Sequence, residues 1–434
     1  MRAVLIDGEH YPDVVAWAIR KLGDVCCAVF LGGTEKIGGI EEVERRVGVP
    51  VYHSPDYLAA LRRALTENDV DEVVDLSDEP VVGYESRFRI ASLCLGLGVP
   101  YRGADFLFFP KPMRRTSKPS IGVIGTGKRV GKTAVSGFIA RTAKRVARPV
   151  VVTMGRGGPE EPELIDGEEM EITPEFLLKL AEKGRHAASD HFEDALTSRV
   201  TTIGCRRCGG GMAGFPFFDV VDGCVELAES LPHDLIILEG SGATFPPYRA
   251  DGYVVVVSAL QGVEKVSHYF GPFRISLADI VVVTMADLAV GGKLDRLVEA
   301  VRAVNPKAEI HLTAFRPRPL GSVAGKRIGL VMTSKPALGP ASEHLRNLGA
   351  EVAAVSGNLS NRGKLVKDLE RFDGIEAVAV ELKAAAVDTV TKWALERGIE
   401  VVYLDSEPVN LDGRDLGESI LRLIERVRAH DARD

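Results

Sequence analysis

The stretch IGVIGTGKRVGKTA, residues 121–134, combines a short apolar run, a glycine-rich turn and the first residues of a helix. The apolar run spans 121–124, and apolar residues recur at helical spacing from Lys132 onward. A strand, a glycine-rich loop and a helix N-terminus in this order present backbone N–H groups to a polyphosphate. The stretch therefore predicts a phosphate-binding loop (P-loop) in an α/β domain with a parallel sheet.

The loop departs from the usual pattern at its first position. That pattern is Gly, four residues, then Gly-Lys-Ser/Thr. Here Thr126 stands where the first glycine is expected, although glycines flank it on both sides. We therefore still expect ATP to bind, with Lys132 on the β and γ oxygens and the Thr133 hydroxyl on Mg²⁺. The candidate nucleotide-binding residues are Gly125, Thr126, Gly127, Val130, Gly131, Lys132, Thr133 and Ala134.

A second apolar run, DLIILEGSGA (234–243), ends in a carboxylate, Glu239. A carboxylate at the carboxyl end of a strand beside the P-loop strand can hold Mg²⁺ or its water shell. A strand-end glutamate by itself is usually solvated, but after a P-loop it is the favoured acidic partner. We therefore predict Thr133 and Glu239 as the magnesium-binding residues.

The segment around the loop is unusually basic. Between Asp105 and Glu160 there is no acidic residue, although the whole chain carries a net charge of −7. The basic residues of the helix after the loop are explained by a solvated helix face. Lys128, Arg129 and Arg156 instead fall at turns that are expected to face phosphate, and ATP alone needs fewer cations. The segment therefore predicts a polyanionic acceptor as well as ATP.

Two further stretches carry candidate chemistry. If GRHAASDHFEDA (184–195) is helical, His186, Asp190, Glu193 and Asp194 share one face, which could bind metal, meet a basic loop or simply face solvent. In GCRRCGGGMAG (204–214), a single Cys-x-x-Cys pair lacks the second ligand pair of a zinc ribbon. A disulfide or two plain thiols are therefore favoured over zinc for Cys205 and Cys208, and the glycine-rich backbone with Arg206 and Arg207 could form an anion-binding nest.

Strand-like and helix-like segments alternate from end to end, which predicts an α/β protein. We expect a smaller Rossmann-like α/β domain at 1–115, a P-loop catalytic domain at 116–325 and a C-terminal α/β portion at 326–434. The expected strands lie at 3–7, 25–33, 71–78, 121–125, 149–155, 233–240, 252–259, 279–287, 327–334, 350–357, 374–381 and 398–405. Whether the last portion extends the central sheet is left open by the sequence.

The first strand is followed by DGEHYPD and not by a Gly-x-Gly-x-x-Gly loop, which argues against a dinucleotide-binding domain. Glu9 and His10 stand at this strand end and could either contact substrate or form a local turn. Together the substrate-binding candidates are Arg156, His186, Asp190, Arg206, Arg207, Glu9 and His10.

Composition limits the class of protein. The net charge of −7 argues against general binding of nucleic acid. No apolar stretch is long enough to span a bilayer or to serve as a signal sequence, so we expect a cytoplasmic protein that does not bind membranes. Gln261 is the single glutamine among many charged residues, which is typical of a thermophile.

The stretch TMAD (284–287) lies where some P-loop GTPases carry an Asn-Lys-x-Asp motif that reads guanine. Only Asp287 matches that motif, because Thr284 and Met285 replace the asparagine and lysine. The sequence therefore favours ATP over GTP.

The P-loop with its Gly125-Thr126 start, followed later by Glu239-Gly240-x-Gly242, is similar to the dethiobiotin synthetase branch of P-loop proteins. Over its whole length the chain resembles the archaeal cyclic 2,3-diphosphoglycerate synthetase family. That resemblance is carried by VLIDGEHYP (4–12), GTGKRVGKTA (125–134), MGRGGPEEPELI (154–165), RHAASDHFEDAL (185–196) and ILEGSGATFPP (237–247). It implies that ATP and 2,3-diphosphoglycerate give cyclic 2,3-diphosphoglycerate, ADP and phosphate, and that the product is an intracellular solute of thermophilic methanogens.

For that reaction, the catalytic candidates are Lys132, Lys128, Arg129, Arg156 and Glu239. One departure matters: related P-loop proteins often carry an aspartate soon after the second strand, where this chain has Arg156. The second carboxylate near the metal is then open, with Asp190 or Glu163 as candidates. The alternatives are a kinase acting on a phosphorylated small acid, and a nucleotide-driven switch or metallochaperone. Because such enzymes are often dimers, we expect a homodimer.

Overall fold

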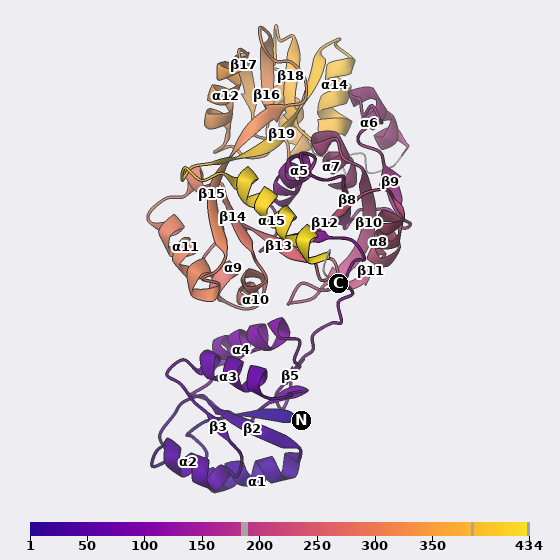
Figure 1. Ribbon diagram of the computed structural model, residues 1–434. Coiled ribbons are helices and arrows are strands. Elements are labelled where there is room, and N and C mark those ends of the chain that lie inside the picture. Colours follow the sequence, from indigo (N-terminus) through magenta and orange to yellow (C-terminus); the bar gives the residue numbers. More distant parts are fainter. Residues whose placement is uncertain (184–189, 383–385, 432–434) are drawn as a thin grey trace. The chain divides into compact units, whose positions relative to one another are not determined.

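A computed structural model describes residues 1–183, 190–382 and 386–431 (Figure 1). The chain divides into two compact units. The first comprises Met1–Pro112, Val263–Leu277 and Ala300–Pro306, and the second comprises Met113–Gly262, Ala278–Glu299 and Lys307–Asp434. Among the described residues no helix is long and apolar enough to cross a bilayer.

The first unit contains a six-stranded sheet in the order β3-β2-β1-β4-β5-β6. Its strands are β1 (Arg2–Ile6), β2 (Val25–Phe30), β3 (Val51–Tyr52), β4 (Glu72–Asp75), β5 (Tyr101–Arg102) and β6 (Leu107–Phe108). Its helices are α1 (Pro12–Leu22), α2 (Ile40–Val47), α3 (Tyr57–Glu67), α4 (Tyr84–Gly96), α9 (Glu264–Ser267) and α10 (Gly271–Ser276). All neighbouring strands are parallel except β5 and β6, which are antiparallel. The parallel alternation expected for this part is therefore present.

The second unit is built on a thirteen-stranded sheet in the order β11-β10-β8-β12-β7-β13-β14-β15-β19-β18-β16-β17, with β9 paired to β10. The strands are β7 (Ser120–Gly125), β8 (Pro149–Gly155), β9 (Glu163–Ile165), β10 (Thr202–Gly210), β11 (Pro216–Asp219), β12 (Leu235–Glu239), β13 (Gly252–Ser258), β14 (Ile280–Thr284), β15 (Glu309–Pro319), β16 (Arg327–Val331), β17 (Glu351–Ser356), β18 (Ala377–Glu381) and β19 (Glu400–Asn410). The C-terminal strands thus extend the central sheet.

The helices of this unit are α5 (Lys132–Ala143), α6 (Pro174–Glu182), α7 (Asp190–Ser198), α8 (Val221–Ser230), most of α11 (Lys293–Val304), α12 (Leu338–Asn347), α13 (Arg362–Leu369), α14 (Lys392–Leu395) and α15 (Leu416–Asp431), with the short 3-10 helix η1 (Ala286–Leu288) and the π-helix η2 (Ala386–Thr391). Helix α5 packs on the central strands together with α15, as Figure 1 shows. Every residue of β7, β8, β12 and β13 is buried, which explains their nearly continuous apolar sequences.

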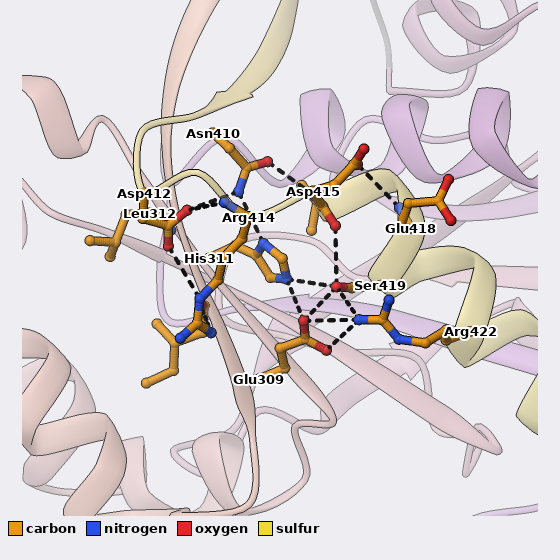
Figure 2. A network of polar contacts seen from close by, with 12 residues as sticks. Glu309, His311, Leu312, Asn410, Asp412, Arg414, Asp415, Glu418, Ser419 and Arg422 are labelled. Carbon is orange, nitrogen blue, oxygen red and sulfur yellow. Dashed lines mark hydrogen bonds and ion pairs between the residues drawn. The ribbon is translucent and has the colours of Figure 1, made fainter.

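The P-loop part and the C-terminal part are joined through one long strand, β15. Its first half is parallel to β14, and its second half is antiparallel to β19. Helix α15, which follows β19, returns to the start of β15 through a network of polar contacts between Glu309, His311, Asn410, Ser419 and Arg422 (Figure 2).

The arrangement of parallel strands places several chain segments at one edge of the sheet. Strands β7, β8 and β12 all end there. Strand β10 is parallel to β8, so it begins at the edge where β8 begins. Helix α7 leads into β10 and runs in the opposite direction, so the first residues of α7 lie at the edge where β8 ends. This edge therefore gathers the P-loop, Glu239 and the start of α7.

Candidate nucleotide and magnesium site

The P-loop connects β7 to α5 with a backbone that depends on glycine at one position. Gly131 has a φ of 86°, and a Cβ there would lie 2.3 Å from the ring of Phe315. A side chain at 131 would meet both a strained backbone and a steric clash. Arg129, also in the loop, has a φ of 62°. The loop thus bends tightly before α5 begins at Lys132, as the sequence predicted.

Thr126, at the unusual first position of the loop, is held by a neighbouring strand and the turn that follows it. Its backbone N–H donates to Val256 O at 3.1 Å. Its hydroxyl donates to Gln261 Oε1 at 2.8 Å. The threonine hydroxyl therefore ties the loop to the turn after β13, a contact that glycine could not make.

Lys132, Thr133 and Glu239 form a buried cluster at the start of α5. Glu239 Oε1 accepts hydrogen bonds from Lys132 Nζ at 3.1 Å and from Thr133 Oγ1 at 2.9 Å. Glu239 is fully buried, and Lys132 is nearly so. Burial alone would raise the pKa of Glu239, but the charge of Lys132 and several side-chain hydrogen bonds outweigh it, so this pKa lies below its usual value. The two residues that the sequence proposed for magnesium are thus in direct contact.

A second carboxylate, Asp194 of α7, reaches the same cluster. Its side chain is fully buried and lies close enough to Glu239 to influence the pKa of that carboxyl. The sequence predicts Asp194 on a polar helix face and leaves Asp190 or Glu163 as the second carboxylate near the metal. Asp190 is the first residue of α7, whereas Glu163 begins β9 and contacts His191 at 3.1 Å. Among the described acidic residues, Asp194 is thus the one that supplies a second carboxylate beside Glu239.

The remaining member of the polar helix face, His186, lies outside the described residues. The helical pattern that united it with Asp190, Glu193 and Asp194 is present only from Asp190 onward in the part of the chain that the structure describes.

Arg206 and Arg207 point to opposite sides of β10, as neighbours in a strand do. Arg207 is buried, and its Nη2 donates to Ser241 O at 2.9 Å, in the loop directly after Glu239. Arg206 is exposed, with Nε donating to Gly158 O at 2.9 Å. Only Arg207 therefore contacts the Glu239 loop, and these residues form a strand rather than the glycine-rich nest that the sequence suggested.

Cys205 and Cys208 lie in the same strand and are both free thiols. Cys205 is buried, whereas Cys208 is exposed, because residues three apart in a strand point to opposite faces. Burial, together with a hydrogen bond to Cys224, raises the pKa of Cys205 well above its ordinary value. Because the two thiols lie on opposite faces of the strand, they are not arranged to chelate one metal ion. A metallochaperone that loads metal on this pair would need both thiols on the same face.

The basic residues proposed for substrate binding differ in their surroundings. Lys128 and Arg129, in the P-loop, are exposed, as is Arg156, in the turn after β8. Since β8 and β12 are adjacent and end together, Arg156 follows a strand that ends beside Glu239. The three cations thus lie in turns at the same sheet edge.

Glu9 and His10 belong to the first unit, at the end of β1. The buried carboxylate of Asp7 accepts hydrogen bonds from the Glu9 backbone N–H at 3.0 Å and from His10 Nδ1 at 2.9 Å. The local turn weighed from the sequence is therefore present, organised by Asp7.

Asp287, the residue that matched the guanine-reading motif, is paired within its own unit. Arg316 Nη1 contacts Asp287 Oδ2 at 2.8 Å. In guanine-binding proteins this carboxylate must be available to the base, so its pairing with Arg316 argues further for ATP.

Two residues of this site were not predicted from the sequence, and for a third, Asp194, the partner was not predicted. Gln261 stood out only as the single glutamine, and His191 was not singled out at all. Asp194 was noticed for its helical spacing, but no local pattern tells which carboxylate it meets. All three contacts join segments that are distant in sequence, and only the fold brings them together.

The fold and the buried Lys132-Thr133-Glu239 cluster define a P-loop nucleotide-binding protein of the α/β class. Three family models match the chain in order. They are the N-terminal domain of cyclic 2,3-diphosphoglycerate synthetase at residues 2–109, its P-loop domain at 120–314 and its C-terminal domain at 319–407. The chain belongs to the cyclic 2,3-diphosphoglycerate synthetase family.

Relatives of this family align over the whole chain. The cyclic 2,3-diphosphoglycerate synthetase of Thermococcus gammatolerans is 73% identical and covers 100% of both chains. That of Thermococcus kodakarensis is 72% identical over 98% of this chain and 99% of its own. Among solved structures, LpxK from Aquifex aeolicus in complex with ATP aligns with 79% of this chain and 96% of its own, at 12% identity and a TM-score of 0.43.

Proposed function

We propose that this protein is an ATP-dependent ligase that closes 2,3-diphosphoglycerate into cyclic 2,3-diphosphoglycerate, releasing ADP and phosphate. The observation that carries the proposal is the buried cluster of Lys132, Thr133 and Glu239 behind the P-loop, in a chain of this family. A P-loop supplies the nucleotide site, and the substrate class comes from the relatives. The product contains an intramolecular phosphoanhydride bond between the two substrate phosphates.

The residues of the cluster fit a magnesium ion. Thr133 Oγ1 and Asp194 each lie next to Glu239, and all three offer the oxygen ligands that hard divalent cations prefer. Two carboxylates in a fully buried position are stabilised by a cation, because burial of like charges is otherwise unfavourable. When bound, Mg²⁺ would neutralise charge on the β and γ phosphates during phosphoryl transfer. We assign Thr133, Glu239 and Asp194 to hold it.

Lys132 is paired with Glu239. With nucleotide bound, its ammonium would turn to the β and γ oxygens, where it stabilises the charge that develops as the γ phosphorus is transferred. The α5 N-terminus contributes backbone N–H groups to the same phosphates.

The reaction then proceeds in two displacements. An oxygen of one substrate phosphate attacks the γ phosphorus, and the bond to the β-phosphate oxygen breaks to give ADP. An oxygen of the second substrate phosphate then attacks the phosphorus of the first substrate phosphate. The former γ-phosphoryl group leaves as inorganic phosphate and takes with it the oxygen that bridged the two phosphorus atoms. Lys128, Arg129 and Arg156 would hold the reacting anions together against their mutual repulsion.

Oxygen labelling tests this order of steps. If the two substrate phosphates carry heavy oxygen, released inorganic phosphate should contain one labelled oxygen, taken from the bridge. Phosphorus NMR of protein, Mg-ATP and 2,3-diphosphoglycerate should show the cyclic product with ADP and free phosphate in equal amounts. Unlabelled phosphate would contradict the route, and a product that retains the γ-phosphate without free phosphate would indicate a kinase.

Replacing Lys132 with alanine should lower kcat by a factor on the order of 10²–10³, because a charge that stabilises the transition state is removed. The matched control is Lys144→Ala, just after the C-terminal end of the same helix, where the side chain is exposed and pairs with Glu168. That variant should turn over at the rate of the unaltered enzyme. Unchanged kcat and ATP affinity in Lys132→Ala would contradict the proposed site.

We further propose ATP as the nucleotide and a cytoplasmic homodimer as the working form. The Asp287–Arg316 pair supports the preference for adenine. Competition between ATP and GTP in steady-state turnover, together with light scattering of the purified protein, checks the nucleotide and the oligomeric state.

A further inference from the structure

A second buried pair of polar side chains lies beside the proposed magnesium residues. His191, the second residue of α7, is buried, and its Nε2 is 3.1 Å from Glu163 Oε2 on β9. The imidazole ring lies directly over β10, since a Cβ on Gly204 would be 2.6 Å from His191 Cγ. Phe192 packs beside it, with ring centroids 4.8 Å apart. The Glu163 carboxylate and the backbone of β10 thus fix the position of the ring.

The strand register connects this pair to Glu239. Gly204 of β10 is opposite Glu163 on one side and Thr153 on the other, and Thr153 is opposite Glu239. Glu163, Gly204, Thr153 and Glu239 therefore form one row across four neighbouring strands. Because adjacent strands are about 4.8 Å apart, Gly204 and Glu239 are separated by roughly 10 Å. His191 and Asp194 cover the same face of this row.

His191 and Asp194 are three residues apart in α7, so they lie on the same face of the helix, one turn apart. Both are buried. His191 contacts Glu163 at one end of the row, and Asp194 contacts Glu239 at the other. The two contacts together fix how the first turns of α7 lie on the sheet.

We propose that His191 and Glu163 are positioning residues that hold Asp194 against Glu239 and thereby set the affinity for the nucleotide-bound divalent cation. The inference rests on the proposed assignment of Asp194 and Glu239 to that cation. A metal ligand on a helix is placed only as accurately as the helix itself, so Asp194 needs a further contact on α7 that fixes its position. The His191–Glu163 contact is such an anchor, and residues that orient a metal ligand typically change metal affinity 10–100-fold when they are replaced.

The anchor can be disturbed from three sides without touching Asp194. His191→Gln replaces the ring, Glu163→Gln removes the carboxylate charge, and Gly204→Ala displaces the ring through the Cβ contact, so each weakens the anchor. Each should weaken Mn²⁺ binding to the enzyme–ADP complex about tenfold, measured by electron paramagnetic resonance. The double variant His191→Gln/Glu163→Gln should be no weaker than either single variant, because both disturb the same contact.

Steady-state kinetics provide a second readout. The Mg²⁺ concentration for half-maximal rate should rise by a similar factor, most of kcat should return at saturating Mg²⁺, and KM for 2,3-diphosphoglycerate should stay constant. A purely structural role predicts a different result, since a partly unfolded enzyme loses kcat at every Mg²⁺ concentration. Phe192→Leu is the matched control, because it loosens the packing of α7 without removing the His191–Glu163 contact. It should lower the unfolding temperature and leave Mn²⁺ affinity unchanged.

The proposal would be overturned if the folded variants His191→Gln and Gly204→Ala bound Mn²⁺ as tightly as the unaltered enzyme. It would also be overturned if Phe192→Leu lost as much Mn²⁺ affinity as these two variants. Asp194→Asn separates this failure from failure of the proposed function. If Asp194→Asn weakens Mn²⁺ binding but the anchor variants do not, only the positioning role is wrong. If Asp194→Asn and Glu239→Gln both bind Mn²⁺ normally, the cation assignment is wrong and the positioning role is rejected with it.

Discussion

At the scale of single residues, the P-loop of this protein carries a threonine with a side-chain hydrogen bond at the position where a flexible glycine is usual. A glycine at its first position would give backbone freedom, whereas Thr126 is held by its hydroxyl on Gln261 and by its N–H on β13. Gln261 is the single glutamine of the chain. Glutamine is a thermolabile residue that this sequence otherwise lacks. Its contact with Thr126 gives Gln261 a specific role, which is to hold the nucleotide loop.

Removing this contact should weaken nucleotide binding. A net hydrogen bond contributes about 0.5–1.5 kcal/mol, so Gln261→Ala and Thr126→Val should each raise the Kd for ADP roughly 2–12-fold. Thr126→Ser keeps the hydroxyl and should bind nearly as well as the unaltered protein. Titration calorimetry checks the three variants. If Thr126→Val binds ADP as tightly as Thr126→Ser, the contact does not support the loop.

At the scale of secondary-structure elements, local pattern was sufficient where a strand is buried on both faces. The expected strand 149–155 is β8 without change, and the expected strand 233–240 is shortened only to β12. Such strands are continuous apolar runs, which a sequence displays directly. The start of α5 at Lys132 was likewise evident from the glycines before it.

Other elements depend on partners that are distant in the chain. Strand β15 was not expected, because its second half contains Pro317 and Pro319 and gains its strand pairing from β19, about ninety residues later. The Cys205–Cys208 segment was not among the expected strands but forms part of β10, since β8 and β11 pair with it. The contact of Asp194 with Glu239 is of the same kind. Pairing across the sheet, rather than local propensity, decides these cases.

The docking of α15 on β15 makes a buried histidine sensitive to acid. Asn410 Oδ1 accepts the Leu416 N–H at 3.1 Å, so its amide nitrogen donates to His311 Nδ1 at 3.0 Å (Figure 2). His311 Nε2 then donates to Ser419 Oγ at 3.0 Å. A proton on Nδ1 would face the amide donor. Burial lowers the pKa of His311, against the opposing effect of Glu309 and Asp412.

Acidification should therefore destabilise this unit. Because the folded pKa of His311 lies below its ordinary value, the unfolded chain binds more protons as pH falls below about 6.5, and stability decreases. One such group changes the free energy of unfolding by at most about 1.4 kcal/mol per pH unit. Denaturant unfolding at pH 7 and pH 5 should show a lower free energy of unfolding at pH 5. His311→Gln should reduce the slope of this free energy against pH. An identical slope in the variant would assign the acid sensitivity to other groups.

At the scale of the whole molecule, the first unit is completed by a segment far along the chain. Helix α10 packs on α4, and Ser92 Oγ donates to Tyr269 O at 3.2 Å just before α10. The ring of Phe270 is edge-on to Phe88, with centroids 5.3 Å apart, and lies 5.2 Å from Phe108. The core of the first unit is thus partly supplied from residues 263–277.

Phe270→Ala should consequently destabilise the first unit and spare nucleotide binding in the second. Removing a buried phenylalanine costs about 3–5 kcal/mol. The chain has two tryptophans, of which Trp17 lies in α1 and Trp393 in α14. In a Trp393→Phe background, Trp17 fluorescence therefore follows denaturant unfolding of the first unit alone, while calorimetry measures the Kd for ADP.

The control for this experiment is Leu107→Ala, in β6 next to Phe108, where the side chain is 56% exposed. Replacing an exposed residue of this kind should change the free energy of unfolding by no more than about 0.5 kcal/mol. If Phe270→Ala unfolds at the same denaturant concentration as this control, the segment 263–277 does not contribute to the core of the first unit. If it instead weakens ADP binding, the two units are energetically coupled, because a cavity in one then changes the site in the other.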